Sequence, residues 1–107
     1  MEKIVEMNAL FDYYSAFLTD QQKEIFELYY EEDLSLGEIA EKAGVSRQNV
    51  YDHLKRTEKL LKECEEKLGL IAEDEKREER MNKVHKILAS HRDSLGADYD
   101  KLVKLLS

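Results

Sequence analysis

The sequence predicts an all-α fold, a helix-turn-helix bundle of about six helices. The chain has no proline and four glycines in 107 residues, so little in it interrupts a helix. Apolar residues recur at helical spacing, and no strand-like alternation of apolar and polar residues appears. Serine and threonine caps, together with glycine stops, divide the chain into successive helices.

The first two helices are expected before residue 31. Residues 3–17 form one helix, whose apolar stripe holds Ile4, Met7, Leu10, Phe11, Tyr14 and Phe17. Thr19 followed by Gln22 is a capping-box pattern, which predicts that a second helix opens at Asp20. This helix should end in the loop Glu31–Asp33. Its inner face would hold Ile25, Phe26, Leu28 and Tyr29.

Residues 35–57 have the pattern of a complete helix-turn-helix. Ser35 with Glu38 is a second capping box, Gly44 suits a turn that needs a positive φ, and Ser46 caps the fourth helix. The residues expected to pack the two helices together are Ile39, Ala40, Val45, Val50 and Leu54. The fourth helix should continue inward with Leu61 and Leu68 and stop at Gly69.

A fifth helix is expected from about Ile71. It begins with a highly charged run and becomes amphipathic at Met81, Val84, Leu88 and Leu95. Gly96 interrupts it, and Asp98 is expected to cap a short last helix. We therefore predict a helix-turn-helix domain, residues 1–70, and a C-terminal helical extension, residues 71–107. The apolar stripe of the extension needs a cover, either the first domain or a second copy of the chain in a homodimer.

The formal net charge of -7 is unevenly distributed. Residues 1–34 carry two basic and nine acidic side chains, whereas residues 35–57 carry four basic and three acidic ones. This acidic front would suit a basic protein partner. The carboxylates expected to form the partner surface are Glu24, Glu27, Glu31, Glu32 and Asp33.

The outward face of the fourth helix is the candidate nucleic-acid surface. Arg47 could pair with guanine O6 and N7, and Gln48 with adenine N6 and N7. Lys55 and Arg56 would meet phosphates, as would the exposed amides near Ser46. The full set is Ser46, Arg47, Gln48, Tyr51, Lys55 and Arg56. The alternative is a structural helix-turn-helix whose outer face binds protein or nothing, because the chain as a whole repels phosphate.

The sequence offers no residues for catalysis, metals or membranes. Cys64 is the single cysteine, and the three histidines do not have metal-ligand spacing. No glycine-rich phosphate loop or catalytic constellation is present. No apolar span of 18 residues exists. We therefore expect a cytoplasmic protein that is not an enzyme, uses no cofactor or metal and does not enter a membrane.

Two stretches of the chain carry a resemblance to known proteins. Residues 18–30, LTDQQKEIFELYY, followed by residues 34–40, LSLGEIA, resemble region four of bacterial sigma factors, which reads the promoter -35 element. With residues 7–14, MNALFDYY, and 45–52, VSRQNVYD, the chain resembles more closely the YlxM family of small helix-turn-helix proteins. The resemblance covers about residues 7–70 and implies a core like sigma region four.

The genes of this family typically adjoin those for the signal recognition particle GTPase and its receptor. The resemblance therefore implies a regulatory or accessory role in co-translational protein targeting, with that GTPase and/or the particle's RNA as partners. Two other hypotheses stay open. One is a DNA-binding transcriptional regulator that uses residues 46–57 as its recognition helix. The other is an interaction module that contacts no nucleic acid.

Overall fold

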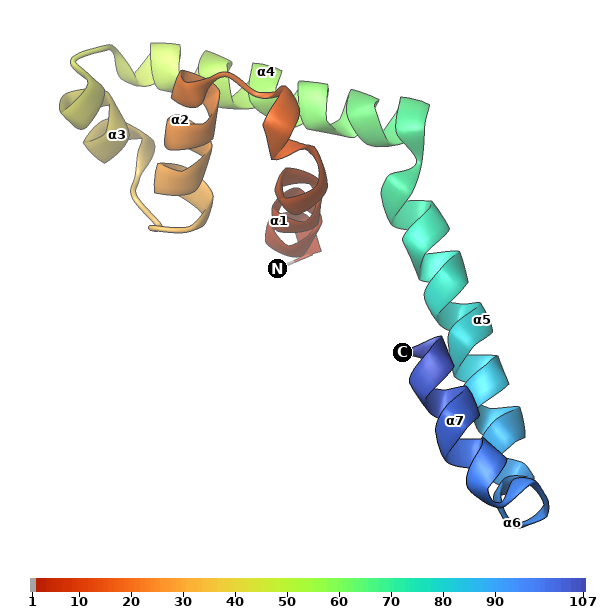
Figure 1. Cartoon of the computed structure of the whole chain (residues 1–107). Coiled ribbons are helices and arrows are strands. Elements are labelled where there is room, and N and C mark those ends of the chain that lie inside the picture. The colour runs from red at the N-terminus through yellow and green to blue at the C-terminus, as the bar shows by residue number, and fades with distance from the viewer. Residues whose placement is uncertain (1) are drawn as a thin grey trace. The chain divides into compact units, whose positions relative to one another are not determined.

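The computed structural model describes residues 2–107, and every regular element in that range is a helix (Figure 1). The elements are α1 (Glu2–Tyr14), the 3-10 turn η1 (Ser15–Phe17), α2 (Asp20–Tyr30), α3 (Leu36–Ala43), α4 (Arg47–Leu68), α5 (Leu70–Ser90), α6 (Arg92–Leu95) and α7 (Ala97–Leu106). The all-α prediction is confirmed. Instead of about six helices there are seven in the described range, because a short extra helix, α6, forms where the fifth helix was expected to end.

The first predicted helix is shorter than expected at its end. The α-helix ends at Tyr14, and the amide of Leu18 bonds to the carbonyl of Ser15 at 3.0 Å, which tightens residues 15–17 into a 3-10 turn. This turn buries Leu18 and leaves Phe17 exposed. Ile4, also placed in the apolar stripe, is exposed as well and lines a surface cavity. The ends of the predicted stripe thus lie outside the core.

The predicted helix boundaries around the turn are confirmed. Thr19 and Ser35 each form a capping box, and the Ser46 hydroxyl accepts a hydrogen bond from the amide of Asn49 at 3.0 Å. Gly44 ends α3 with a φ of 70°, a left-handed conformation that favours glycine. Gly69 ends α4 in the same way. Local residue chemistry therefore decides where these helices begin and end.

α4 is the spine of the helix-turn-helix region, and α1, α2 and α3 all pack on it (Figure 1). Its buried residues join two hydrophobic clusters. The first cluster comprises Met7, Leu10, Phe11, Tyr14, Leu18, Phe26 and Leu61. The second comprises Ile25, Leu28, Ile39, Ala40, Val50 and Leu54. The rings of Phe11 and Phe26 stack at 4.5 Å and lock α1 against α2.

Two residues assigned to the packed faces are more exposed than expected. Val45 lies in the turn between α3 and α4, and Leu68 lies in the last turn of α4. The two clusters reach along α4 from Val50 to Leu61, so both residues lie beyond the ends of the core. Both side chains therefore remain in contact with solvent instead of being enclosed by the core.

A network at the start of α5 is completed by side chains of α1 and α4. The hydroxyl of Tyr14 donates to the carboxylate of Glu65 and accepts from the amide of Leu70 at 3.1 Å. Glu65 also accepts from the amide of Ile71 at 3.0 Å. The first amides of a helix have no partner within the helix, and these two are satisfied by the network. We call these four residues the junction network.

The chain divides into a first compact unit that ends at Ile71 and a second unit, Ala72–Ser107. In the second unit the chain reverses direction at α6, and α7 runs back along α5 (Figure 1). The expected cap at Asp98 is wrong: Gly96, with a φ of 54°, occupies the cap position and no side chain caps the helix. Asp98 lies in the first turn, where its charge favours the helix dipole.

Candidate nucleic-acid and protein interfaces

The helix-turn-helix is built on the capping box of α3. The amide of Ser35 donates to the Glu38 carboxylate at 3.0 Å, and the Ser35 hydroxyl accepts from the Glu38 amide at 3.1 Å. Both bonds lower the pKa of Glu38, and the bond from the Ser35 backbone amide has the larger effect. After Gly44, the amide of Val45 bonds back to the carbonyl of Ala40 at 3.0 Å, and α4 begins at Arg47. The turn therefore fixes the direction in which α4 leaves α3.

The six predicted nucleic-acid residues are all exposed, from Ser46 at the cap of α4 through its third turn. Gln48, Tyr51 and Lys55 lie three and four residues apart, so they share one outward face. Arg47 precedes this face and Arg56 flanks it. We call these residues the recognition surface: Ser46, Arg47, Gln48, Tyr51, Lys55 and Arg56.

Neighbouring carboxylates occupy part of the recognition surface. Gln48 Nε2 donates to Asp52 Oδ1 at 3.0 Å, so Gln48 must release this bond before it can read a base. Lys55 Nζ lies 5.5 Å from the centre of the Tyr51 ring and 3.5 Å from Glu58 Oε1. Within residues 2–107, Arg47 and Arg56 form no ion pair. The cations free to meet a phosphate are therefore mainly these two arginines.

A buried carboxylate, absent from the sequence predictions, connects the recognition surface to the first two helices. The Glu58 side chain is only 8% exposed, and its Oε2 accepts from the Tyr30 hydroxyl at 2.5 Å. Its Oε1 lies 3.4 Å from Lys3 Nζ and 3.5 Å from Lys55 Nζ. We call these four residues the Glu58 cluster. It joins α1, α2 and α4 and holds Lys55 beside Tyr51.

The surroundings of Glu58 decide its protonation. Burial alone would raise its pKa, but the Tyr30 hydroxyl and the ammonium groups of Lys3 and Lys55 outweigh burial and lower it. The sequence alone does not single out Glu58, because this residue lies in a run of alternating charges, residues 55–80, which is typical of a solvated helix surface. The available signal was spacing: Glu58 lies four residues after Leu54 and eight after Val50, on the inner face of α4.

The predicted acidic partner residues lie on α2 and on the loop that follows it. Glu27 is half-buried, and Glu24, Glu31, Glu32 and Asp33 are exposed. In the described part of the chain none of these five carboxylates pairs with a basic side chain. We call them the acidic surface. Its unpaired charges remain available for an external cation.

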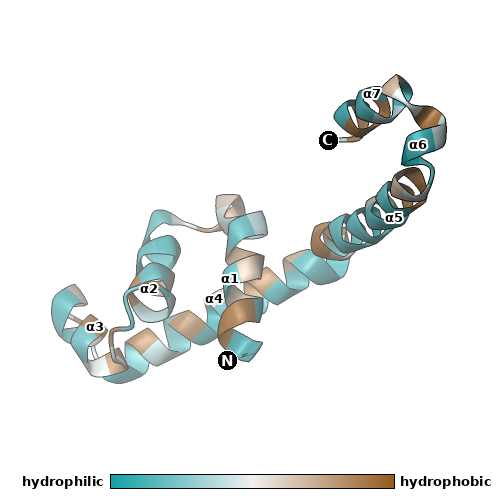
Figure 2. Cartoon of the chain, turned by 90° about the horizontal axis from the view of Figure 1, so that it is seen from below, coloured by the Kyte–Doolittle hydropathy of each residue, from teal (hydrophilic) through white to brown (hydrophobic). Residues whose placement is uncertain are grey.

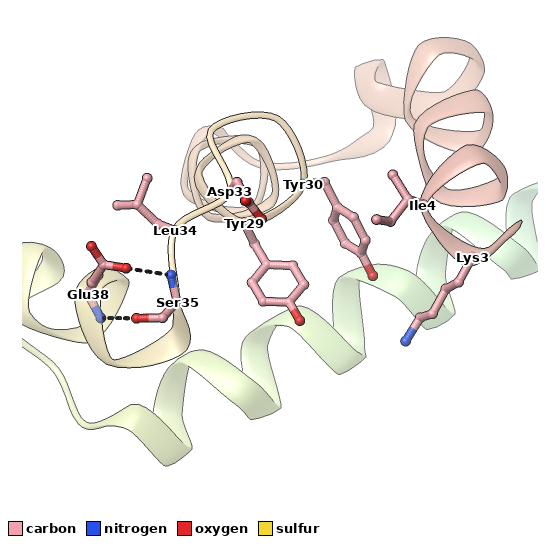
Figure 3. A pocket seen from close by; sticks show the side chains of 8 residues that line it. All are labelled: Lys3, Ile4, Tyr29, Tyr30, Asp33, Leu34, Ser35 and Glu38. Atoms are coloured by element: carbon pink, nitrogen blue, oxygen red, sulfur yellow. Dashed lines mark hydrogen bonds between the residues drawn. The ribbon is translucent and has the colours of Figure 1, made fainter. Parts of the chain in front are cut away.

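A cavity of about 420 Å³ lies next to the acidic surface (Figure 3). Its walls come from the start of α1, the end of α2 and the loop to α3. Figure 3 shows the rings of Tyr29 and Tyr30 with Leu34 and Asp33 around it, and the Ser35–Glu38 capping box at one side. The lining of the cavity combines aromatic and aliphatic side chains with charged ones of both signs, the carboxylates of Asp33 and Glu38 and the ammonium group of Lys3.

Residues 2–107 contain neither a cluster of metal-ligating side chains nor a helix that could cross a membrane. No three histidine, cysteine, aspartate or glutamate side chains in this range gather where they could hold a metal ion. No helix in this range is long and apolar enough to cross a bilayer.

His53 Nδ1 is buried and has no hydrogen-bond partner within residues 2–107. Burial is the main cause that lowers the pKa of this histidine, and the nearby charge of Arg56 lowers it further.

Comparison with known proteins identifies relatives over most of the chain. A family model of helix-turn-helix proteins, described as YlxM / p13 like, matches residues 1–99. The UPF0122 protein of Halalkalibacterium halodurans is 56% identical over 79 residues, which cover 74% of this chain and 72% of the relative. The UPF0122 protein YlxM of Bacillus subtilis is 47% identical over 93 residues, which cover 87% of this chain and 84% of the relative.

Proposed function

Because the chain belongs to the YlxM / p13-like helix-turn-helix family, we propose that it is a regulatory or accessory protein of the signal recognition particle pathway. It acts by binding, without catalysis. Its partners are the particle's GTPase, which has a basic RNA-binding domain, and/or the particle's RNA. The pathway comes from the gene neighbourhood of the family, and the surfaces of this chain suggest how each partner would be met.

One observation carries the proposal: the acidic surface is free, whereas the recognition surface is partly neutralised. The five carboxylates of the acidic surface pair with no basic side chain in residues 2–107. On the recognition surface, Lys55 pairs with Glu58, and Gln48 bonds to Asp52. A basic protein would therefore gain more from the acidic surface than a duplex would gain from α4. Protein binding is the main activity that we propose.

A second function, DNA binding by a transcriptional regulator, is favoured by the exposed start of α4. Arg47 and Gln48 stand in the first turn of the second helix of a helix-turn-helix, where such motifs contact base edges. In this function Gln48 exchanges its bond with Asp52 for a base, and Arg56 meets a phosphate.

A binding titration separates the two functions. The purified chain is titrated with the particle GTPase, with particle RNA and with random duplex DNA, each at two salt concentrations. We expect the GTPase to bind, and we expect the triple change Glu31→Gln, Glu32→Gln, Asp33→Asn to weaken that binding about tenfold to a hundredfold. This range corresponds to three exposed ion pairs of about 0.5–1 kcal/mol each.

The matched control removes three carboxylates elsewhere. Glu75→Gln, Glu78→Gln and Glu79→Gln change the net charge equally, on exposed positions of α5. This control should leave GTPase binding unchanged. Tight duplex binding that falls steeply with salt and is lost with Arg47→Ala and Arg56→Ala would instead support the transcriptional regulator and refute the proposal.

A further inference from the structure

The second unit, Ala72–Ser107, has a hydrophobic side without a core. None of its residues is buried. Ile87 is 62% exposed and Leu105 is 81% exposed, and Figure 2 shows hydrophobic residues on α5, α6 and α7. A chain segment of fewer than about 40 residues rarely builds a sufficient core alone, and oligomerisation is one of the usual remedies. This unit therefore needs a cover.

The uncovered surface follows one edge of α5. Val84 and Leu88 are four residues apart, and Ile87 is three residues after Val84, so all three lie on one side of the helix. Leu88 is half-buried, whereas Val84 and Ile87 are exposed. Ala89 points to the opposite side. The open edge that a partner would cover is thus formed by Val84 and Ile87.

The charge of the second unit suits a second copy of itself. Residues 72–107 carry eight basic and eight acidic side chains, whereas residues 1–71 carry nine basic and sixteen acidic ones, so the whole net charge of -7 lies in the first unit. Within the second unit, residues 72–80 carry three bases and five acids, and residues 81–107 carry five bases and three acids. Two copies in antiparallel orientation would place each acidic segment against a basic one.

We propose that the chain forms a homodimer in which the second units of two copies pair in antiparallel orientation about a two-fold axis. The open edges of the two α5 helices are buried together in a four-helix arrangement with the two α7 helices. The 21 residues of α5 offer a surface about 30 Å long. An interface of standard size uses about 20–30 residues a side, which the 36 residues of this unit can supply.

Sedimentation of the full chain tests the dimer. We expect the wild type to sediment with twice the 12.6 kDa mass of one chain and to dissociate on dilution. The change Ile87→Glu together with Val84→Glu should raise the dissociation constant at least about a hundredfold, because two apolar side chains lose their burial. Ala89→Glu adds a carboxylate to the opposite side of α5 and should leave the dissociation constant unchanged. Circular dichroism checks that each variant keeps its helix content.

Charge reversal tests the antiparallel orientation. Lys83→Glu with Lys86→Glu gives residues 81–107 a net negative charge like that of residues 72–80, and it should weaken the dimer. Glu73→Lys with Glu75→Lys gives residues 72–80 a net positive charge like that of residues 81–107. Mixing the two variants should restore a mixed dimer, because the segments of one variant are then acidic and those of the other basic. The control reverses Lys62 and Lys67, exposed lysines of α4, and should not weaken the dimer.

Three results would overturn the proposal. A wild type that stays monomeric at every concentration would mean that the first unit of the same chain covers α5, or that nothing does. A dimer that survives Ile87→Glu and Val84→Glu would mean that another surface pairs. A dimer that Lys83→Glu and Lys86→Glu do not weaken beyond the α4 control would exclude the antiparallel orientation.

Discussion

Removing the Tyr30 hydroxyl should destabilise the first unit through the Glu58 cluster. Tyr30→Phe keeps the ring, whose centre lies 4.6 Å from that of Phe26, and deletes only the donor that bonds Glu58 at 2.5 Å. A hydrogen bond to a charged group contributes about 1.5–3 kcal/mol. Because Tyr30 is only half-buried, we expect a loss near the lower end, about 1.5–2 kcal/mol in the free energy of unfolding at neutral pH.

The effect should depend on pH because the partner is a carboxylate. The folded-state pKa of Glu58 lies below its usual value of 4.5, so its ionisation stabilises the fold above pH 4.5. That contribution is lost as the pH falls through the folded-state pKa. Below it the hydrogen bond is neutral, and the cost of Tyr30→Phe should shrink to about 1 kcal/mol.

Urea unfolding at neutral pH and below the folded-state pKa of Glu58 measures both quantities. The control is Tyr29→Phe, which removes a neighbouring hydroxyl that forms no hydrogen bond within residues 2–107. It should change the free energy of unfolding by less than about 0.5 kcal/mol. Equal costs for Tyr30→Phe at both pH values, or a cost no larger than that of the control, would refute the charge-assisted bond.

Three further predictions concern the first unit. Gly44→Ala should lower the free energy of unfolding by about 1 kcal/mol, because alanine is strained at a φ of 70°. Gly37→Ala, inside α3, should be neutral or stabilising by about 0.5–1 kcal/mol, because an added Cβ would have its nearest neighbour, Ser35 Oγ, at 3.9 Å. Thermal unfolding of the two variants compares these effects. Phe26→Ala should cost about 3–5 kcal/mol in urea unfolding, because the ring is fully buried. Burial, and then bonds to carboxylates, raise the pKa of Tyr14 and Tyr30. The stability that these two protonated hydroxyls contribute is therefore complete below pH 10.0 and is lost as the pH rises through their folded-state pKa values. Tyrosinate absorbance should show two late titrations together with alkaline unfolding, and the absence of any late titration would contradict the cause assigned here.

Features that depend on residues close together in the sequence could be predicted. The capping boxes at Thr19 and Ser35 and the cap at Ser46 involve partners three residues away. Most of the inner faces of α1, α2 and α4 follow the helical period for the same reason. The exceptions lie at the ends, where Phe17 and Leu68 keep the period but remain exposed.

The Glu58 cluster could not be predicted, because its partners come from distant segments. Lys3 and Tyr30 are 55 and 28 residues from Glu58, and only the packing of α1 and α2 on α4 brings them together. The exposure of the recognition surface could be predicted from the helical period. The bond between Gln48 and Asp52 depends on which rotamers the two side chains adopt, so spacing alone did not reveal it.

The junction network makes two backbone amides sensitive to a helix that is distant in the sequence. Amides in the first turn of a helix usually exchange rapidly with solvent hydrogen, because they have no partner within the helix. The amide of Leu70 is bonded to Tyr14 of α1, and the amide of Ile71 is bonded to Glu65 of α4, whose carboxylate also accepts from the Tyr14 hydroxyl. Exchange should therefore be slow while α1 stays docked, directly at Leu70 and through Glu65 at Ile71. The exchange rate at these two positions therefore reports the local release of the N-terminal helix, whether heat, a substitution or a partner that binds α1 causes it.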